Sequence, residues 1–131
     1  MLVEVERIAS LPGSPLTAQV RTAFGRAAVR WCGAPTAGAG EYHVEWTVDE
    51  DIAWGRNAES AVGTGPEIRP DGQCVVLRGH LRLAEDGVGL LDLDGATVLL
   101  DLTAPVPDGV VGTWVELRVA RETLALYPYD L

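Results

Sequence analysis

The strongest constraint on the fold is a two-residue alternation of apolar and polar side chains that recurs along the chain between turn dipeptides. Alternation with this period is typical of β-strands, whose successive side chains point to opposite faces. Dipeptides such as Asp94-Gly95 supply the tight turns between strands. The pattern predicts an all-β fold with strands at residues 2–9, 17–24, 27–32, 41–48, 51–56, 74–84, 87–93, 96–102, 112–120 and 122–128.

Two hairpins follow from these turns. A two-residue turn at Gly25-Arg26 would set Arg21 opposite Arg30 on the polar face of the first hairpin. Its apolar face would consist of Val20, Thr22, Phe24, Ala27, Val29 and Trp31. A turn at Asp94-Gly95 gives the second hairpin an apolar face of Leu91, Leu93, Ala96, Val98, Leu100 and Leu102. A shift of one residue would mix apolar and polar side chains on both faces of each hairpin. The clean separation of the two faces therefore favours these turn positions.

An α+β fold, with a helix at about residues 15–32, is the alternative. Ser14-Pro15 is a good helix start and Gly33 a good helix end. Leu16, Val20, Phe24, Ala27 and Trp31 would form one helical stripe. Gly25 in the middle of that segment, together with its valines and threonines, weighs against the helix.

The two halves of the chain have similar strand and loop spacing. Residues 1–57 form a predicted N-terminal β subdomain, residues 58–73 a Gly-, Ala- and Pro-rich linker, and residues 74–131 a C-terminal β subdomain. The internal repeat would superimpose 41–48 on 112–119. These features predict two small barrel-like or β-meander halves packed together.

The rhythm of residues 74–128 is that of a small Greek-key barrel. A long strand is followed by two Asp-Gly turns and a Pro/Gly loop, which leads into Gly112-Thr113-Trp114-Val115. This resembles the OB-fold or SH3-like class of small β-barrels. The resemblance is at the level of the fold and implies no ligand. Oligonucleotide-binding barrels use a basic face, whereas the corresponding face here would carry Asp92 and Asp101.

Charge restricts the choice of partner. The chain has 10 Arg, no Lys and 19 carboxylates, for a formal net charge of −9. A field of this sign repels nucleic-acid phosphates and attracts basic proteins. The densest acidic spot, Asp49-Glu50-Asp51, is predicted to be a solvated hairpin tip. We find no membrane-spanning segment, and the acidic start lacks the basic region of a signal peptide, so we expect a cytoplasmic protein.

Chemistry-bearing residues are sparse. Cys32 and Cys74 are expected to be reduced thiols, because with His43 and His80 they show no zinc-ligand spacing. The turn at Asp94 explains the run of acids around it better than a cation site does. No serine lies in a nucleophile elbow, and no phosphate-binding loop is present. The sequence therefore predicts a protein that is not an enzyme and that uses no metal and no cofactor.

Six residues are candidates for binding. Arg21 and Arg30, with Glu45 between them, would form a surface cluster or a site for an anion. Trp114, predicted to face outward, and Tyr127 and Tyr129 near the C-terminus are candidate interface anchors. Alternatively, the C-terminal segment closes the barrel and buries both tyrosine rings.

These features predict a non-enzymatic, acidic module that binds a protein partner, which is expected to be basic. An inhibitor or immunity-type protein is one concrete form of this function. The alternative function is that of a β-barrel that binds a small molecule.

Overall fold

The computed structural model describes residues 1–10 and 13–130, and it confirms the all-β prediction. The strands are β1 (Leu2–Ala9), β2 (Thr17–Thr22), β3 (Gly25–Trp31), β4 (Gly40–Ile52), β5 (Ala58–Ser60), β6 (Glu67–Asp71), β7 (Cys74–Leu83), β8 (Gly89–Leu93), β9 (Ala96–Leu102), β10 (Trp114–Ala120) and β11 (Leu124–Tyr129). A single 3-10 turn, η1 (Arg121–Thr123), precedes β11. Residues 15–32 contain β2 and β3, so the helical alternative is wrong.

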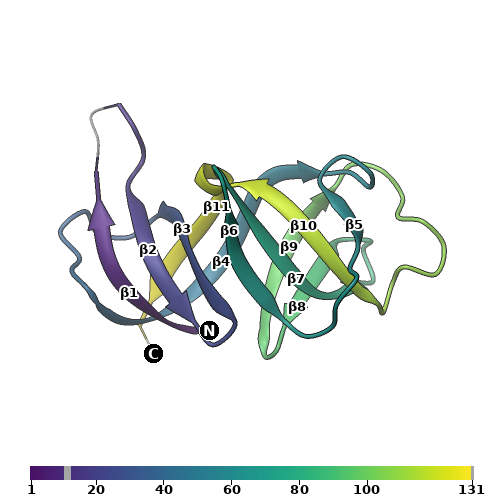
Figure 1. The fold of residues 1–131 in the computed structure, drawn as a ribbon, viewed down its shortest axis with the longest axis horizontal. Coiled ribbons are helices and arrows are strands. Elements are labelled where there is room, and N and C mark those ends of the chain that lie inside the picture. The colour runs from purple at the N-terminus through teal and green to yellow at the C-terminus, as the bar shows by residue number, and fades with distance from the viewer. Residues whose placement is uncertain (11–12, 131) are drawn as a thin grey trace.

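Eight of the strands pair in a closed circuit that forms a barrel, and a further strand, β11, pairs with two strands of that circuit. Eight strands pair in the order β1-β2-β3-β6-β7-β8-β9-β4, and β4 returns to β1. Strand β11 lies between β3 and β4, parallel to β3 and antiparallel to β4. It thereby closes a ring of five strands, β1-β2-β3-β11-β4. Figure 1 shows the resulting first lobe beside a second lobe that contains β5 to β10.

The lobes are connected through β4 and β11 and through the pairing of β3 with β6. The first part of β4 pairs with β1 and β11, whereas its last residues, Asp51 and Ile52, pair with β9 in the second lobe. Strand β11 follows β10 of the second lobe in sequence but lies in the first lobe (Figure 1). The buried side chains of both lobes form one continuous cluster. Each lobe therefore depends on chain from the other half.

The second hairpin has the predicted register, whereas the first does not. Leu93 pairs with Ala96 around the turn at Asp94-Gly95, as predicted. In the first hairpin Thr22 pairs with Gly25, so the turn is at Ala23-Phe24 instead of Gly25-Arg26. The Thr22 hydroxyl closes this turn, because it accepts from the Phe24 N–H and donates to the Gly25 carbonyl. The shift is even, so the inward face keeps Val20, Ala27, Val29 and Trp31, all of which are buried.

The segment predicted as a linker, residues 58–73, instead contains β5 and β6. Strand β6 pairs with β7 along its whole length, and β5 pairs with β10. Strand β4 pairs antiparallel with β1, and β10 pairs antiparallel with β7, the first strand of the predicted C-terminal half. The internal repeat predicts this kind of correspondence, and the duplication itself stays a prediction.

Candidate functional site

Four directly opposed residues form a row across the outer face of the second lobe. Thr97 of β9 pairs with Asp92 of β8, Asp92 pairs with His80 of β7, and His80 pairs with Trp114 of β10. Directly opposed residues on neighbouring strands point to the same face of a sheet. Their sequence neighbours, including Leu81, Leu91, Leu93, Val98 and Val115, are buried, so the row itself points outward.

A groove of about 710 Å³ lies over this row. It is lined by Pro66, His80, Asp92, Asp94, Gly95, Ala96, Thr97 and Trp114. The His80 and Trp114 rings meet edge-to-face, with their centroids 4.1 Å apart and their planes at 83°. Both side chains are half-buried, so each presents part of its ring to a ligand in the groove. We call this feature the Trp114 groove.

The acidic side of the Trp114 groove is held in a fixed geometry. Asp92 accepts a hydrogen bond from Arg82 Nη2 at 3.0 Å and a second one from Arg82 Nε. The Thr97 hydroxyl donates to the same carboxylate at 3.0 Å. These hydrogen bonds, of which the one from Arg82 has the largest effect, lower the pKa of Asp92 despite its partial burial. Asp92 is therefore ionised at neutral pH. Asp94, at the turn, is exposed and has no ion pair among the described residues.

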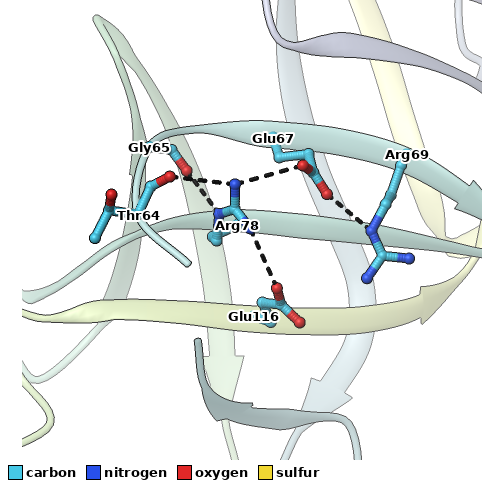
Figure 2. A network of polar contacts seen from close by, with 6 residues as sticks. All are labelled: Thr64, Gly65, Glu67, Arg69, Arg78 and Glu116. Carbon is cyan, nitrogen blue, oxygen red and sulfur yellow. Dashed lines mark hydrogen bonds and ion pairs between the residues drawn. The ribbon is translucent and has the colours of Figure 1, made fainter. Parts of the chain in front are cut away.

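A half-buried arginine, Arg78, holds the segment next to Pro66 of the groove. Arg78 Nε donates to the Gly65 carbonyl at 2.8 Å and Nη2 donates to the Thr64 carbonyl at 3.2 Å. Its guanidinium also pairs with Glu67 at 3.4 Å and with Glu116 at 3.6 Å (Figure 2). The segment that carries Pro66 is thus tied to β7 and β10. Sequence reasoning missed this network, although Arg78 lies two residues from His80.

The predicted cluster of Arg21, Arg30 and Glu45 does not form. With the turn at Ala23-Phe24, Arg21 lies opposite Arg26, and Arg30 lies opposite Thr17. Arg21 pairs with Glu6 at 3.4 Å, while Arg30 pairs with Asp49. Glu45 is exposed on β4 opposite Tyr127. The prediction failed because it depended on the register of the first hairpin.

The predicted aromatic anchors lie in different places. Trp114 borders the groove in the second lobe, whereas Tyr127 and Tyr129 lie on β11 in the first lobe. Both tyrosine side chains stay 41% exposed, although β11 closes the five-stranded ring as the alternative supposed. Tyr129 packs against His43, with ring centroids 6.1 Å apart. The three aromatic residues therefore do not form one site.

The acidic run at residues 49–51 lies within β4 and is not a hairpin tip. Glu50 there accepts hydrogen bonds from the Ala120 N–H at 3.0 Å, the Thr123 hydroxyl at 3.1 Å and the Asn57 amide at 2.9 Å. Burial alone would raise the pKa of Glu50, but these hydrogen bonds outweigh it and lower the pKa. The carboxylate thus joins β4 to the end of β10, a structural use that the prediction of a solvated tip missed.

Replacement of Glu50 is expected to destabilise the fold in a pH-dependent way. The folded state lowers the pKa of Glu50, so its contribution to stability is present above the unfolded-state pKa and is lost as the pH falls through the folded-state pKa. Glu50→Gln should therefore cost about 1–3 kcal/mol at pH 7 and less at acidic pH. Denaturant unfolding across this pH range measures the difference. Glu45→Gln, on the exposed side of the same strand, is the control; an equal loss there would refute the assigned role.

Metal sites, thiols and membrane-spanning helices give little further indication of function. No group of three or more His, Cys, Asp and Glu side chains in residues 1–10 and 13–130 is arranged to hold a metal ion. Cys32 and Cys74 are free thiols. In the same described part of the chain, no helix is long and apolar enough to cross a membrane.

Comparison with known proteins finds no matching family model, no matching curated protein and no matching solved structure.

Proposed function

We propose that the chain is a non-enzymatic binding module for a basic protein partner and that the Trp114 groove receives a cationic side chain of that partner. The observation that carries this proposal is the position of a half-exposed indole beside two carboxylates, those of Asp92 and Asp94. A cation is attracted to the face of an indole and to a carboxylate, so the two groups together suit an arginine or a lysine.

The charge of the chain supports a basic partner. The formal net charge of −9 gives a long-range field that steers basic molecules toward the surface. Because Arg82 already neutralises Asp92, the unpaired carboxylate of Asp94 is the closest free charge for an incoming cation. Such an attraction falls as salt screens it, so the binding should be salt-dependent.

The surroundings of the groove support binding over catalysis. Thr97 provides the single hydroxyl among the lining residues, and it donates to Asp92. The His80 ring packs against Trp114 and faces no nucleophile within the lining. General-base catalysis would need a hydroxyl or thiol within reach of the histidine. An inhibitor or immunity-type protein that covers a basic enzyme is one form of this module.

The barrel class also supports a binding role. Within the resemblance to OB-fold or SH3-like barrels, β7, β8 and β9 correspond to the first three strands of a small barrel. OB-fold barrels bind ligands on the face of their second and third strands, and the groove includes Asp92 of β8 and Thr97 of β9. Since the carboxylates repel phosphate, a protein ligand fits this face better than a nucleic acid.

A small-molecule ligand is the second candidate, and the size of the groove favours it. Its volume of about 710 Å³ falls in the range of roughly 300–1,000 Å³ that is common for small-molecule sites. A melting shift with an uncharged metabolite, in the absence of any response to basic peptides, would select this candidate.

Titration of the full chain with blocked oligo-arginine and oligo-lysine peptides tests the proposed function. We expect amide and indole NMR shifts at Trp114 and around Asp94, with no response to oligo-glutamate. Trp114→Ala should weaken binding about tenfold or more, as loss of an interface anchor does. Asp94→Asn keeps a residue that tolerates the positive φ of 41° at the turn and should weaken binding less.

Tyr127→Ala is the matched control, because it removes an exposed aromatic ring from the other lobe. It should leave the affinity for the peptides unchanged. Weaker binding in Tyr127→Ala with wild-type binding in Trp114→Ala would place the interface on the first lobe. Absence of any response to the basic peptides would refute a basic partner.

A further inference from the structure

A second surface of the molecule has the opposite charge. Of the 10 arginines, six form ion pairs with carboxylates within the described residues: Arg21, Arg30, Arg69, Arg78, Arg82 and Arg118. Three of the other four, Arg7, Arg26 and Arg121, line one pocket of about 440 Å³. With 19 carboxylates in the chain, unpaired arginines are exceptions, and their gathering in one pocket requires an explanation.

Five elements, β1, β2, β3, β6 and η1, build this pocket, which we call the Arg121 pocket. Arg7 of β1 lies opposite Gln19 of β2, and Gln19 lies opposite Ala28 of β3, so their side chains share one face. Arg26 is two residues before Ala28 and points to the same side. Arg121 comes from η1, which is placed by a hydrogen bond from its backbone N–H to the Gln73 carbonyl. Pro70 completes the lining.

The pocket is not neutralised by its own lining. Its one carboxylate, that of Glu6, pairs with Arg21 outside the pocket at 3.4 Å. Arg26 lies directly opposite Arg21 across the β2–β3 ladder, so its own cross-strand neighbour is a cation and not a carboxylate. Arg7, Arg26 and Arg121 therefore have no ion pair among the described residues.

We propose that the Arg121 pocket binds the phosphate group of a small phosphorylated ligand. A phosphate dianion offers three oxygens and close to two negative charges, which suits three guanidinium forks better than a single carboxylate does. Ala28 contributes only a small side chain to the lining, and the Gln19 amide adds a neutral donor. The negative field of the whole chain is screened beyond about 8 Å at physiological ionic strength, so it does not prevent short-range contacts.

This inference is independent of the proposed function. The Arg121 pocket is lined by β1, β2, β3, β6 and η1, whereas the Trp114 groove is formed by the outer face of β7 to β10 and by Pro66. The ligand classes also have opposite charge. Either site can therefore be present without the other.

Titration of the full chain with inorganic phosphate at constant ionic strength tests the pocket. We expect NMR shifts of the Nε–H groups of Arg7, Arg26 and Arg121 and a higher melting temperature. The double variant Arg26→Gln/Arg121→Gln should lose about tenfold or more in affinity, because it removes two charge-assisted contacts. Arg56→Gln removes the fourth unpaired arginine, which lies outside the pocket, and should bind like the wild type.

The other arms identify the source of the phosphate. A sugar phosphate that binds more tightly than inorganic phosphate would indicate a small metabolite, and equal affinities would indicate free phosphate; either result supports the pocket. Tighter binding of citrate than of phosphate would overturn the ligand class. An equal loss in Arg56→Gln and in the double variant, or no arginine shifts with phosphate, would overturn the site.

Discussion

A chain that ends at residue 123, without β11, is expected to lose cooperative folding. Strand β11 pairs with both β3 and β4 and closes the five-stranded ring. Its residues Leu124, Ala125 and Leu126 are all 0% exposed. Burial of one leucine stabilises a fold by about 1.5–3 kcal/mol, and whole domains are stable by only about 5–15 kcal/mol. Loss of the Leu124 and Leu126 side chains, together with the pairing of β11 with β3 and β4, should therefore remove most of the free energy of unfolding.

Thermal and urea unfolding, followed by far-ultraviolet dichroism and NMR dispersion, measure this loss. A chain that ends at Tyr129 is the control, because it removes residues beyond β11 and should melt like the full chain. If the shorter chain, ending at 123, unfolded cooperatively with dispersed resonances, the first lobe would not depend on β11. The result also tests residues 1–57 as an independent subdomain, since they contain β1 to β4 but not β11.

Local patterns predicted the parts of the fold that depend on neighbouring residues. The turn at Asp94-Gly95 fixed the register of β8 and β9, because these two residues adopt the positive φ angles that the turn needs. The alternation of side chains also placed Val20, Val29 and Trp31 inside the barrel despite the wrong turn. An even shift in register leaves each side chain on the same face of the sheet, but it changes which residues lie opposite each other.

The missed features are non-local. In the sequence Gly25 is typical of a turn, but in the structure the absence of a side chain lets its backbone lie close to Ile68 of β6, which is 43 residues away in sequence. Strand β5 is three residues long, too short for a visible alternation. Glu50 reads as an exposed tip because its partners, Ala120 and Thr123, come from the far end of the chain.

The sequence predicted only part of the candidate site, because the rest depends on pairing between strands. The parity of β10 gave the outward direction of Trp114, and the parity of β8 gave that of Asp92. Their meeting with His80 depends on two registers: that of β7 and β8, across the loop that contains Asp86-Gly87, and that of β7 and β10, which are distant in sequence and share no turn. The Arg121 pocket is lined by five elements from different parts of the chain, so no single sequence motif predicts it.

Gly25→Ala is expected to be among the most destabilising substitutions in the protein. Gly25 has a φ of +136°, in a region that residues with a Cβ rarely adopt. A Cβ at this position would lie 2.0 Å from the Ile68 carbonyl oxygen, which belongs to the backbone of β6. To make room, β6 would have to move away from β3 and break the hydrogen bond from the Ile68 N–H to the Phe24 carbonyl. We expect a loss of about 3 kcal/mol or more in denaturant unfolding.

Gly40→Ala separates the effect of the close contact from that of the backbone angle. Gly40, at the start of β4, has a similar φ, of 149°, but no heavy atom would lie within 4 Å of a Cβ there. Its replacement should cost only about 1–3 kcal/mol, the cost of a sparsely populated backbone angle without the close contact. Equal losses in the two variants would mean that Gly25 serves the backbone angle alone. A larger loss for Gly25 would indicate that contact between β3 and β6, and with it closure of the eight-strand circuit, stabilises the fold.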